Sequence, residues 1–156
     1  MIVSVDVEDA GWEAIPALEQ LTRDALAAAA LAARADVAAS EVNVLFTGDA
    51  SIAEINREWR GKDGATNVLS FPADDFPVPA GEAKPLGDIV LALGVIASEA
   101  AEQEKPLPHH ATHLIVHGFL HLLGYDHADD AEAAAMERLE TDILKGLGIP
   151  GPYERQ

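Results

Sequence analysis

The sequence contains no cysteine, and this absence excludes both a disulfide framework and every metal site built on thiolates. Any metal ion must therefore be held by nitrogen and oxygen ligands. The chain also lacks an apolar run near the roughly 18 residues that a membrane span needs. Its longest such run, Ala25–Ala33, is mostly alanine, and its first residues lack the basic and then apolar segments of an export signal. We expect a cytoplasmic protein with no membrane partner.

Basic residues are scarce, with 10 lysines and arginines against 27 acidic residues and a formal net charge of −17. This balance argues against a broad basic face of the kind that grips nucleic acid without regard to sequence. Three of the basic residues, Arg57, Arg60 and Lys62, nevertheless fall within six positions. A local basic spot therefore remains on an acidic chain.

The chain of 156 residues, 49% of them hydrophobic, has room for one ordinary core, so we expect a single domain over residues 1–156. Alternation and helical spacing predict strands at 2–7, 42–46, 67–71 and 88–93, and helices at about 13–34, 51–60, 95–104, 109–123 and 136–147. This order predicts an α+β layered fold with a mixed sheet of about four strands and about five helices. The helix at 109–123 is apolar nearly all round, so we expect it to be central and buried.

Local signals refine some of these boundaries. Ser51 followed by Glu54 forms a capping-box pattern that predicts a helix start, and Gly61 stands where that helix would end, with Arg60 in its last turn. Residues 72–85 contain four prolines, and we expect an exposed loop there. The residues after 150 are expected to be frayed.

The segment His117–His127, HGFLHLLGYDH, has the spacing of a metal site. His117 and His121 lie four residues apart, so on a helix they share one face with a rise of roughly 6 Å. Gly124 lets the backbone turn at the helix end, which can bring His127 back towards the pair. The pattern therefore predicts that His117, His121 and His127 together bind one metal ion.

Three neutral ligands leave a fourth tetrahedral position for water, which is typical of a catalytic Zn²⁺ ion. The pKa of the bound water falls to roughly 7, so hydrolysis is the natural class of reaction. His113 lies two helical turns from His121 and is expected near the site but not on the ion, while His109 and His110 are expected to be structural. Asp126 either orients a group of the site or belongs to the turn.

Two kinds of hydrolysis are compatible with such a metal site. The histidine frame is also that of the metzincin proteases, but their glutamate base follows the first histidine, where this chain has Gly118. Phosphodiester hydrolysis instead needs cations for the charge that develops on the phosphoryl oxygens. Arg60 is the candidate for that role, and the alternative is a solvated arginine that interacts with the helix dipole.

Two blocks of this sequence resemble a known family. HGFLHLLGYDH closely resembles the signature of the YbeY-type endoribonucleases, bacterial enzymes of ribosomal RNA maturation, and the segment Asn56–Pro72, NREWRGKDGATNVLSFP, is similar to their other characteristic block. Leu86–Val90, LGDIV, is similar as well, so the resemblance covers roughly Val42 to Leu144. The chain departs from the family at Asn67, where an aspartate is usual, and at the two residues after LGDIV.

The resemblance implies a zinc-dependent endoribonuclease that cuts single-stranded RNA in small-subunit (16S) ribosomal RNA maturation and ribosome quality control. It implies His117, His121 and His127 as metal ligands, Arg60 as the residue that engages the phosphate, and a second, catalytic role for His117. The expected partners are ribosomal RNA and ribosomal or ribosome-assembly proteins. The rival hypothesis is a non-catalytic assembly factor in which the metal is structural and the acidic surface binds basic ribosomal proteins.

Overall fold

The computed structural model describes residues 1–73 and 78–153. In these residues the elements follow one another as β1 (Ile2–Val7), the 3-10 helix η1 (Ala10–Ala14), α1 (Leu18–Ala32), β2 (Ser40–Thr47), α2 (Asp49–Arg60), β3 (Val68–Pro72), β4 (Lys84–Ala92), α3 (Leu93–Glu102), α4 (Leu107–Leu122) and α5 (Asp130–Gly146).

The strands form one mixed sheet with the order β1-β2-β4-β3. β1, β2 and β4 are parallel, with Val3 opposite Val42 and Val44 opposite Ile89, and β3 runs antiparallel to β4 at the edge. Parallel neighbours require crossover connections, and α1 supplies the one between β1 and β2. The α+β prediction, with four strands and five α-helices in the described residues, is confirmed.

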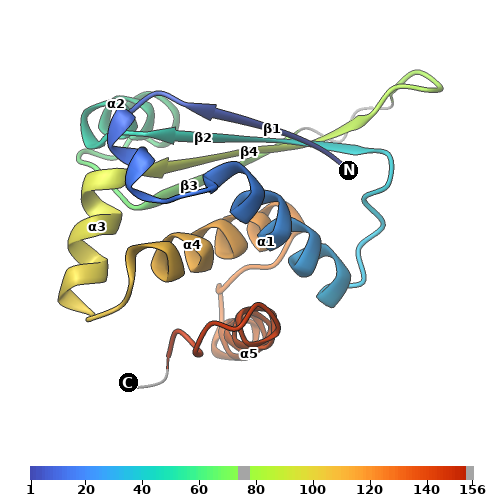
Figure 1. Ribbon diagram of the computed structural model, residues 1–156. Helices are drawn as coiled ribbons and strands as arrows, with labels where there is room; N and C mark the ends of the chain where they lie inside the picture. The colour runs from blue at the N-terminus through green and yellow to red at the C-terminus, as the bar shows by residue number, and fades with distance from the viewer. Residues whose placement is uncertain (74–77, 154–156) are drawn as a thin grey trace.

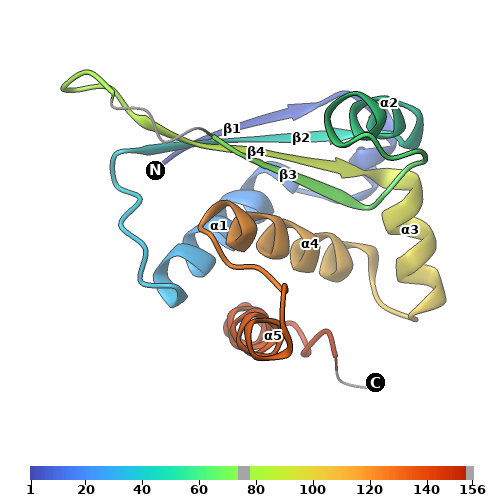
Figure 2. The same ribbon diagram turned by 180° about the vertical axis from the view of Figure 1, so that it is seen from behind.

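The helices lie in layers on the sheet, as Figures 1 and 2 show from opposite sides. α1 and α4 cover one face, α5 packs below them, and α2 covers one end of the other face (Figure 1). α4 contacts β3, β4, α1, α3 and α5, and ten of its sixteen residues are buried. The prediction that the histidine-bearing helix is central is therefore confirmed.

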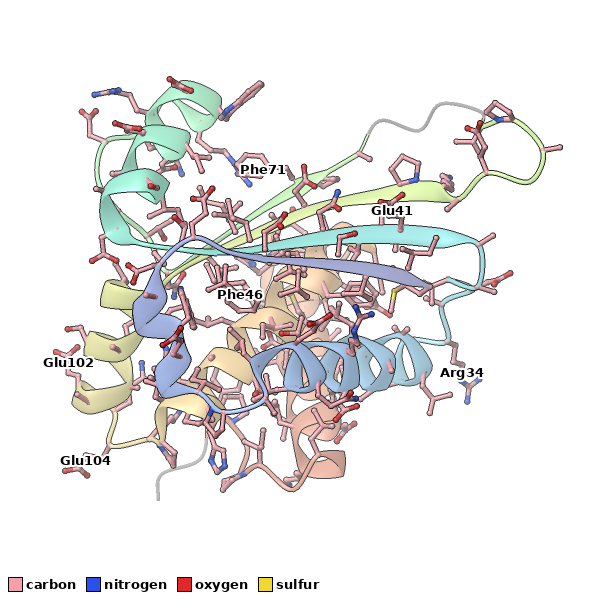
Figure 3. The ribbon with its side chains drawn as sticks, turned by 45° about the horizontal axis from the view of Figure 1, so that its top comes forward. Arg34, Glu41, Phe46, Phe71, Glu102 and Glu104 are labelled. Carbon is pink, nitrogen blue, oxygen red and sulfur yellow. The ribbon has the colours of Figure 1, made fainter. Side chains whose placement is uncertain are left out.

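Two apolar cores hold the layers together. The larger core lies between the sheet and α1, α4 and α5, and Phe46 of β2 points into it (Figure 3). A smaller core under α2 contains Ile52, Leu69, Val90 and Ala92. β4 is therefore apolar on both faces at its carboxyl end, because helices cover both sides of the sheet there.

The predicted start of the helix at 13–34 is wrong, because α1 begins at Leu18. Pro16 holds the preceding Ile15 in an extended conformation, which separates η1 from α1. In η1 the fully buried Trp12 donates a hydrogen bond from Nε1 to the backbone oxygen of Thr47, at 2.9 Å. This tertiary contact holds the segment to the sheet, and it has no local signature in the sequence.

Two other boundaries are also corrected. α2 begins at Asp49 with Gly48 as its N-cap, so Ser51 is inside the helix and does not cap it. The Asp49 carboxylate instead accepts a hydrogen bond from the backbone N–H of Val95, at 3.0 Å, which ties α2 to α3. β4 begins at Lys84, four residues earlier than expected, because its backbone pairs with β2 from Ser40 onward and this pairing needs no apolar side chains.

The expected loop at 72–85 is shorter than predicted, since Pro72 closes β3 while Lys84 and Pro85 belong to β4. Residues 74–77 of that loop lie outside the described part of the chain. At residue 67, where the resemblance leads us to expect an aspartate, the Asn67 side chain donates to the Glu99 carboxylate at 3.0 Å and accepts from the N–H of Val68 at 2.6 Å. Among the helices of residues 1–73 and 78–153, none has the length and apolar character to cross a membrane.

Candidate metal centre

The end of α4 turns sharply at Gly124. The helix ends at Leu122, and Gly124 has a φ of 100°, a conformation that side-chain-bearing residues rarely adopt. The N–H of Gly124 bonds to the oxygen of His121 at 3.0 Å, and the N–H of Tyr125 bonds to that of Leu120 at 3.0 Å. The glycine turn that the sequence predicts is therefore present, and it redirects the chain towards the pair of histidines on α4.

The turn brings three histidines together. Nε2 of His121 lies 3.1 Å from Nε2 of His117. The ring of His127 lies 5.3 Å from that of His121 and 6.1 Å from that of His117, between centroids. One nitrogen from each ring falls within 4.8 Å of the others, so the three side chains could hold one metal ion.

The hydrogen bonds of the rings set which nitrogens face the cluster. Nδ1 of His121 donates to the backbone oxygen of Tyr125 at 2.9 Å, since a carbonyl only accepts. Nδ1 of His117 donates to the carboxylate of Glu140. With the proton of each ring on Nδ1, the two Nε2 atoms face each other as unprotonated nitrogens. Two lone pairs at 3.1 Å repel each other, and a cation between them removes that repulsion.

The distances fit a small tetrahedral ion. Zinc binds imidazole nitrogen at about 2.0–2.1 Å, which separates two ligand nitrogens by roughly 3.3 Å in a tetrahedron. The 3.1 Å between the two Nε2 atoms is close to that value. Burial, with the adjacent His117, lowers the pKa of His121 below its usual 6.5, which favours the neutral ring that a metal needs. The geometry supports the predicted ligand set.

Arg60 reaches the same place from another part of the chain. It is the last residue of α2, which Gly61 ends with a φ of 65°, and its Nη2 donates to the backbone oxygen of Ser70 at 2.7 Å. The guanidinium lies over the ring of Phe71, 5.4 Å from the centroid, and Figure 3 shows Phe71 beside α2. A pocket of about 730 Å³ is lined by Arg60 and Lys62 as well as by the three histidines.

Gly118 has a packing role that the sequence does not reveal. α4 crosses the sheet so closely there that an added Cβ would lie 2.9 Å from Cγ2 of Ile89 and 3.1 Å from Oγ of Ser70. That hydroxyl donates to the backbone oxygen of Gly118 at 2.9 Å. A glutamate, as in the metzincin frame, would therefore collide with the sheet. This contact weighs further against the protease interpretation.

The remaining histidines and Asp126 occupy supporting places. His110 is buried and its Nε2 bonds to the carboxylate of Glu99 at 3.0 Å, as expected of a structural residue. His113 lies next to His117, with ring centroids 6.2 Å apart. Asp126 is exposed and accepts from the N–H of His127 at 2.8 Å; its Oδ1 also lies 3.9 Å from Nδ1 of His127, and the residue lines the pocket, so it belongs to the turn and borders the site.

Sequence reasoning missed Glu140 and Tyr153. Glu140 is fully buried on α5 and bonds to His117, and Tyr153 donates to Glu140 at 2.6 Å. The expectation that the chain is frayed after residue 150 is therefore wrong for Tyr153. A signal was available, because Glu140 stands between Met136 and Ile143 on the apolar face of α5.

The fold and the pocket define a class of protein: a small α+β domain with a histidine cluster of the kind that holds a catalytic metal ion in hydrolases. The family model described as "Endoribonuclease YbeY" matches residues 6–148. The chain therefore belongs to the Endoribonuclease YbeY family.

Relatives named "Endoribonuclease YbeY" support this membership. The one from Rhizobium johnstonii is 52% identical over 99% of this chain and 94% of its own length. One from Rhizobium etli is 49% identical with the same coverage, and one from Bradyrhizobium is 49% identical over 91% of this chain and 86% of its own length. The chain is accordingly a hydrolase of the endonuclease class. This membership favours an enzyme over the alternative hypothesis of a non-catalytic assembly factor.

The solution structure of TM1509 from Thermotoga maritima has a similar fold. The two superpose with a TM-score of 0.60 at 21% identity, over 99% of this chain and 100% of the other. At this identity the similarity speaks for the fold alone.

Proposed function

We propose that this chain is a zinc-dependent endoribonuclease that cuts single-stranded RNA during maturation of small-subunit (16S) ribosomal RNA and in ribosome quality control. It acts as one domain over residues 1–156 in the cytoplasm, where ribosomes are assembled. The observation that supports the proposal most is that Arg60, from α2, and the histidine cluster, from α4 and the turn after it, line one pocket. Metal ligands beside a guanidinium suit a phosphodiester.

In this proposal His117, His121 and His127 would hold one Zn²⁺ ion. When bound there, the ion supplies the Lewis acidity that hydrolysis at neutral pH requires. His117 would act in catalysis through the ion that it holds, because its Nδ1 donates to Glu140 and leaves only Nε2 for the pocket.

Arg60 binds the phosphate opposite the ion. One of its nitrogens is tied to Ser70, which fixes the direction of the guanidinium, and its other N–H groups are left for phosphoryl oxygens. The negative charge that develops on those oxygens is thus stabilised from a fixed position. Lys62 lines the same pocket and adds a second positive charge for the RNA backbone.

The acidic surface shapes the proposed partners. A net charge of −17 repels free RNA over most of the molecule, so RNA contact is confined to the pocket and its cations. Basic ribosomal or ribosome-assembly proteins would attract the rest of the surface and bring the enzyme to its substrate. Binding to ribosomal proteins is therefore part of the proposal.

The test compares cleavage of a structured ribosomal RNA with single-stranded segments by wild type, Arg60→Ala, His121→Ala and Arg57→Ala. Arg57 is the matched control, because it is also an exposed arginine in the last turn of α2 but does not line the pocket. We expect Arg60→Ala to lose about 10²- to 10³-fold in rate, His121→Ala to lose activity with its metal, and Arg57→Ala to change little. Equal cleavage by all four proteins would show a contaminant and end the proposal. Casein digestion abolished by a chelator would instead favour a protease.

A further inference from the structure

A buried carboxylate lies directly behind the histidine cluster. Glu140 of α5 is fully buried, and its Oε1 accepts a hydrogen bond from Nδ1 of His117. Its Oε2 accepts from the hydroxyl of Tyr153 at 2.6 Å and lies 3.6 Å from Nε2 of His113. Both oxygens of this carboxylate are therefore engaged, one by a residue of the cluster and one by the end of the chain.

We infer that Glu140, oriented by Tyr153, is a positioning residue that fixes the imidazole of His117 with Nε2 towards the pocket. This inference rests on the proposed function, because Glu140 can affect metal binding only if His117 is a ligand of the ion. A carboxylate on the far nitrogen of a ligating histidine sets the tautomer and the ring orientation, and it makes the ligating nitrogen more basic.

The surroundings of Glu140 stabilise its hydrogen bond with His117. Burial raises the pKa of Glu140, but the contacts with His113, His117 and Tyr153 outweigh this effect and lower the pKa to about 2. Oε2 of Glu140 accepts from the Tyr153 hydroxyl and Oε1 faces Nδ1 of His117, so the carboxylate serves as an acceptor on both sides and the proton of the His117 contact lies on Nδ1. His121 is also protonated on Nδ1, but its Nδ1 donates to a neutral backbone oxygen, that of Tyr125. Of these two histidines, only His117 therefore donates to a carboxylate.

The same residues allow a different arrangement. His113, His117 and Glu140 also place one ligand atom each within 4.8 Å of the others, so they form a second candidate metal group. An ion there would take Nδ1 of His117 in place of the proton that Glu140 accepts. Two observations favour the proton: the hydrogen bond from His117 to Glu140, and the second hydrogen bond that Tyr153 donates to the same carboxylate.

The test measures the affinity of the purified full chain for Zn²⁺ alone, by competition with a chelator of known affinity. Glu140→Gln keeps an acceptor and removes the charge, while Glu140→Met removes both. Glu137→Gln is the matched control, since Glu137 borders the same small cavity one turn earlier but, among the described residues, forms no hydrogen bond or ion pair with a histidine. We expect the two Glu140 variants to bind zinc about 10- to 100-fold more weakly than wild type, and the control to match it.

The tautomer of His117 provides a second readout that needs no metal. In nitrogen-detected imidazole spectra of the metal-free protein, wild type should show His117 protonated on Nδ1. Glu140→Met should shift it towards the Nε2-protonated form that free histidine prefers. A residue that only supported the packing of α5 would leave this tautomer unchanged, so the spectrum separates positioning from structure.

Each outcome decides between the two claims. Zinc affinity and tautomer unchanged in Glu140→Met would overturn this inference and leave the proposed function intact, whereas a wild type that binds no zinc would overturn both. A second zinc ion per chain that disappears in His113→Ala would also overturn the inference. If the Glu140 variants do not fold, Tyr153→Phe provides the test, because Tyr153 is half-exposed and its replacement should not prevent folding. We expect this variant to bind zinc more weakly than wild type, and an unchanged zinc affinity would refute the inference.

Discussion

Replacing Gly118 with alanine should destabilise the fold, although alanine is the better helix former. The new Cβ would lie 2.9 Å from Cγ2 of Ile89, 3.1 Å from Oγ of Ser70 and 3.3 Å from Cγ2 of Val68. Ile89 is fully buried on β4, and Ser70 is held by its hydrogen bond to the Gly118 oxygen, so neither neighbour gives way freely. The backbone of α4 must therefore move away from the sheet.

Two opposing contributions decide the magnitude. Alanine in a helix interior is about 1 kcal/mol more favourable than glycine, while overpacking of a close-packed core costs about 1–3 kcal/mol. The net effect on Gly118→Ala is a destabilisation of up to about 2 kcal/mol. At about 2–4 °C per kcal/mol for a chain of this size, Tm should fall by up to roughly 8 °C.

Gly146→Ala supplies the matched control. Gly146 is the last residue of α5, and in the described part of the chain nothing would lie within 4 Å of its added Cβ. This variant should be as stable as wild type or more stable by up to about 1 kcal/mol. Thermal and denaturant unfolding of both variants measures the steric cost as their difference. A Gly118→Ala protein as stable as Gly146→Ala would refute the close approach of α4 to the sheet.

Three further predictions concern the surroundings of the site. Asn67→Asp should lower stability by about 2 kcal/mol, because it sets a second carboxylate against Glu99 in place of a donor, and adding Glu99→Gln should restore it. Burial lowers the pKa of His110 below its usual 6.5, so its contribution to stability is complete above about pH 6.5 and is lost as the pH falls through the lowered pKa. Unfolding of His110→Gln should accordingly depend less on pH than that of wild type between about pH 7.5 and 5. If Arg60 and Lys62 make the two main phosphate contacts, a plot of log affinity for single-stranded RNA against log salt concentration should have a slope of about −1.4. In Lys62→Ala, which loses one contact, the slope should be about −0.7. A much steeper slope would indicate a broad basic face.

The histidine cluster could be predicted from the sequence because its determinants are local. Helical spacing relates His117 to His121, and one glycine at position 124 permits the turn that returns His127. The sheet and the central helix were predictable for the same reason, since alternation and a helix apolar all round reflect burial directly.

The rest of the site depends on contacts between distant segments. The sequence alone leaves Arg60 either a phosphate-binding candidate or a solvated arginine, and the family resemblance decides for the site. Its place in the structure follows from Ser70, whose backbone oxygen accepts from the guanidinium and whose hydroxyl donates to α4. Glu140 shares the apolar face of α5 with Met136 and Ile143, but its contact with His117 arises only because α5 packs on α4. The start of α2 at Asp49 likewise depends on α3.

The central claim is that one zinc ion held by His117, His121 and His127 drives RNA hydrolysis in the pocket that Arg60 lines. The most direct measurement is a titration of metal-free protein with Zn²⁺ in which bound ion and cleavage of a single-stranded 16S ribosomal RNA fragment are followed together. We predict that the rate rises in proportion to bound zinc and levels off at one ion per chain. Cleavage by the metal-free protein at the rate of the loaded protein would contradict the claim.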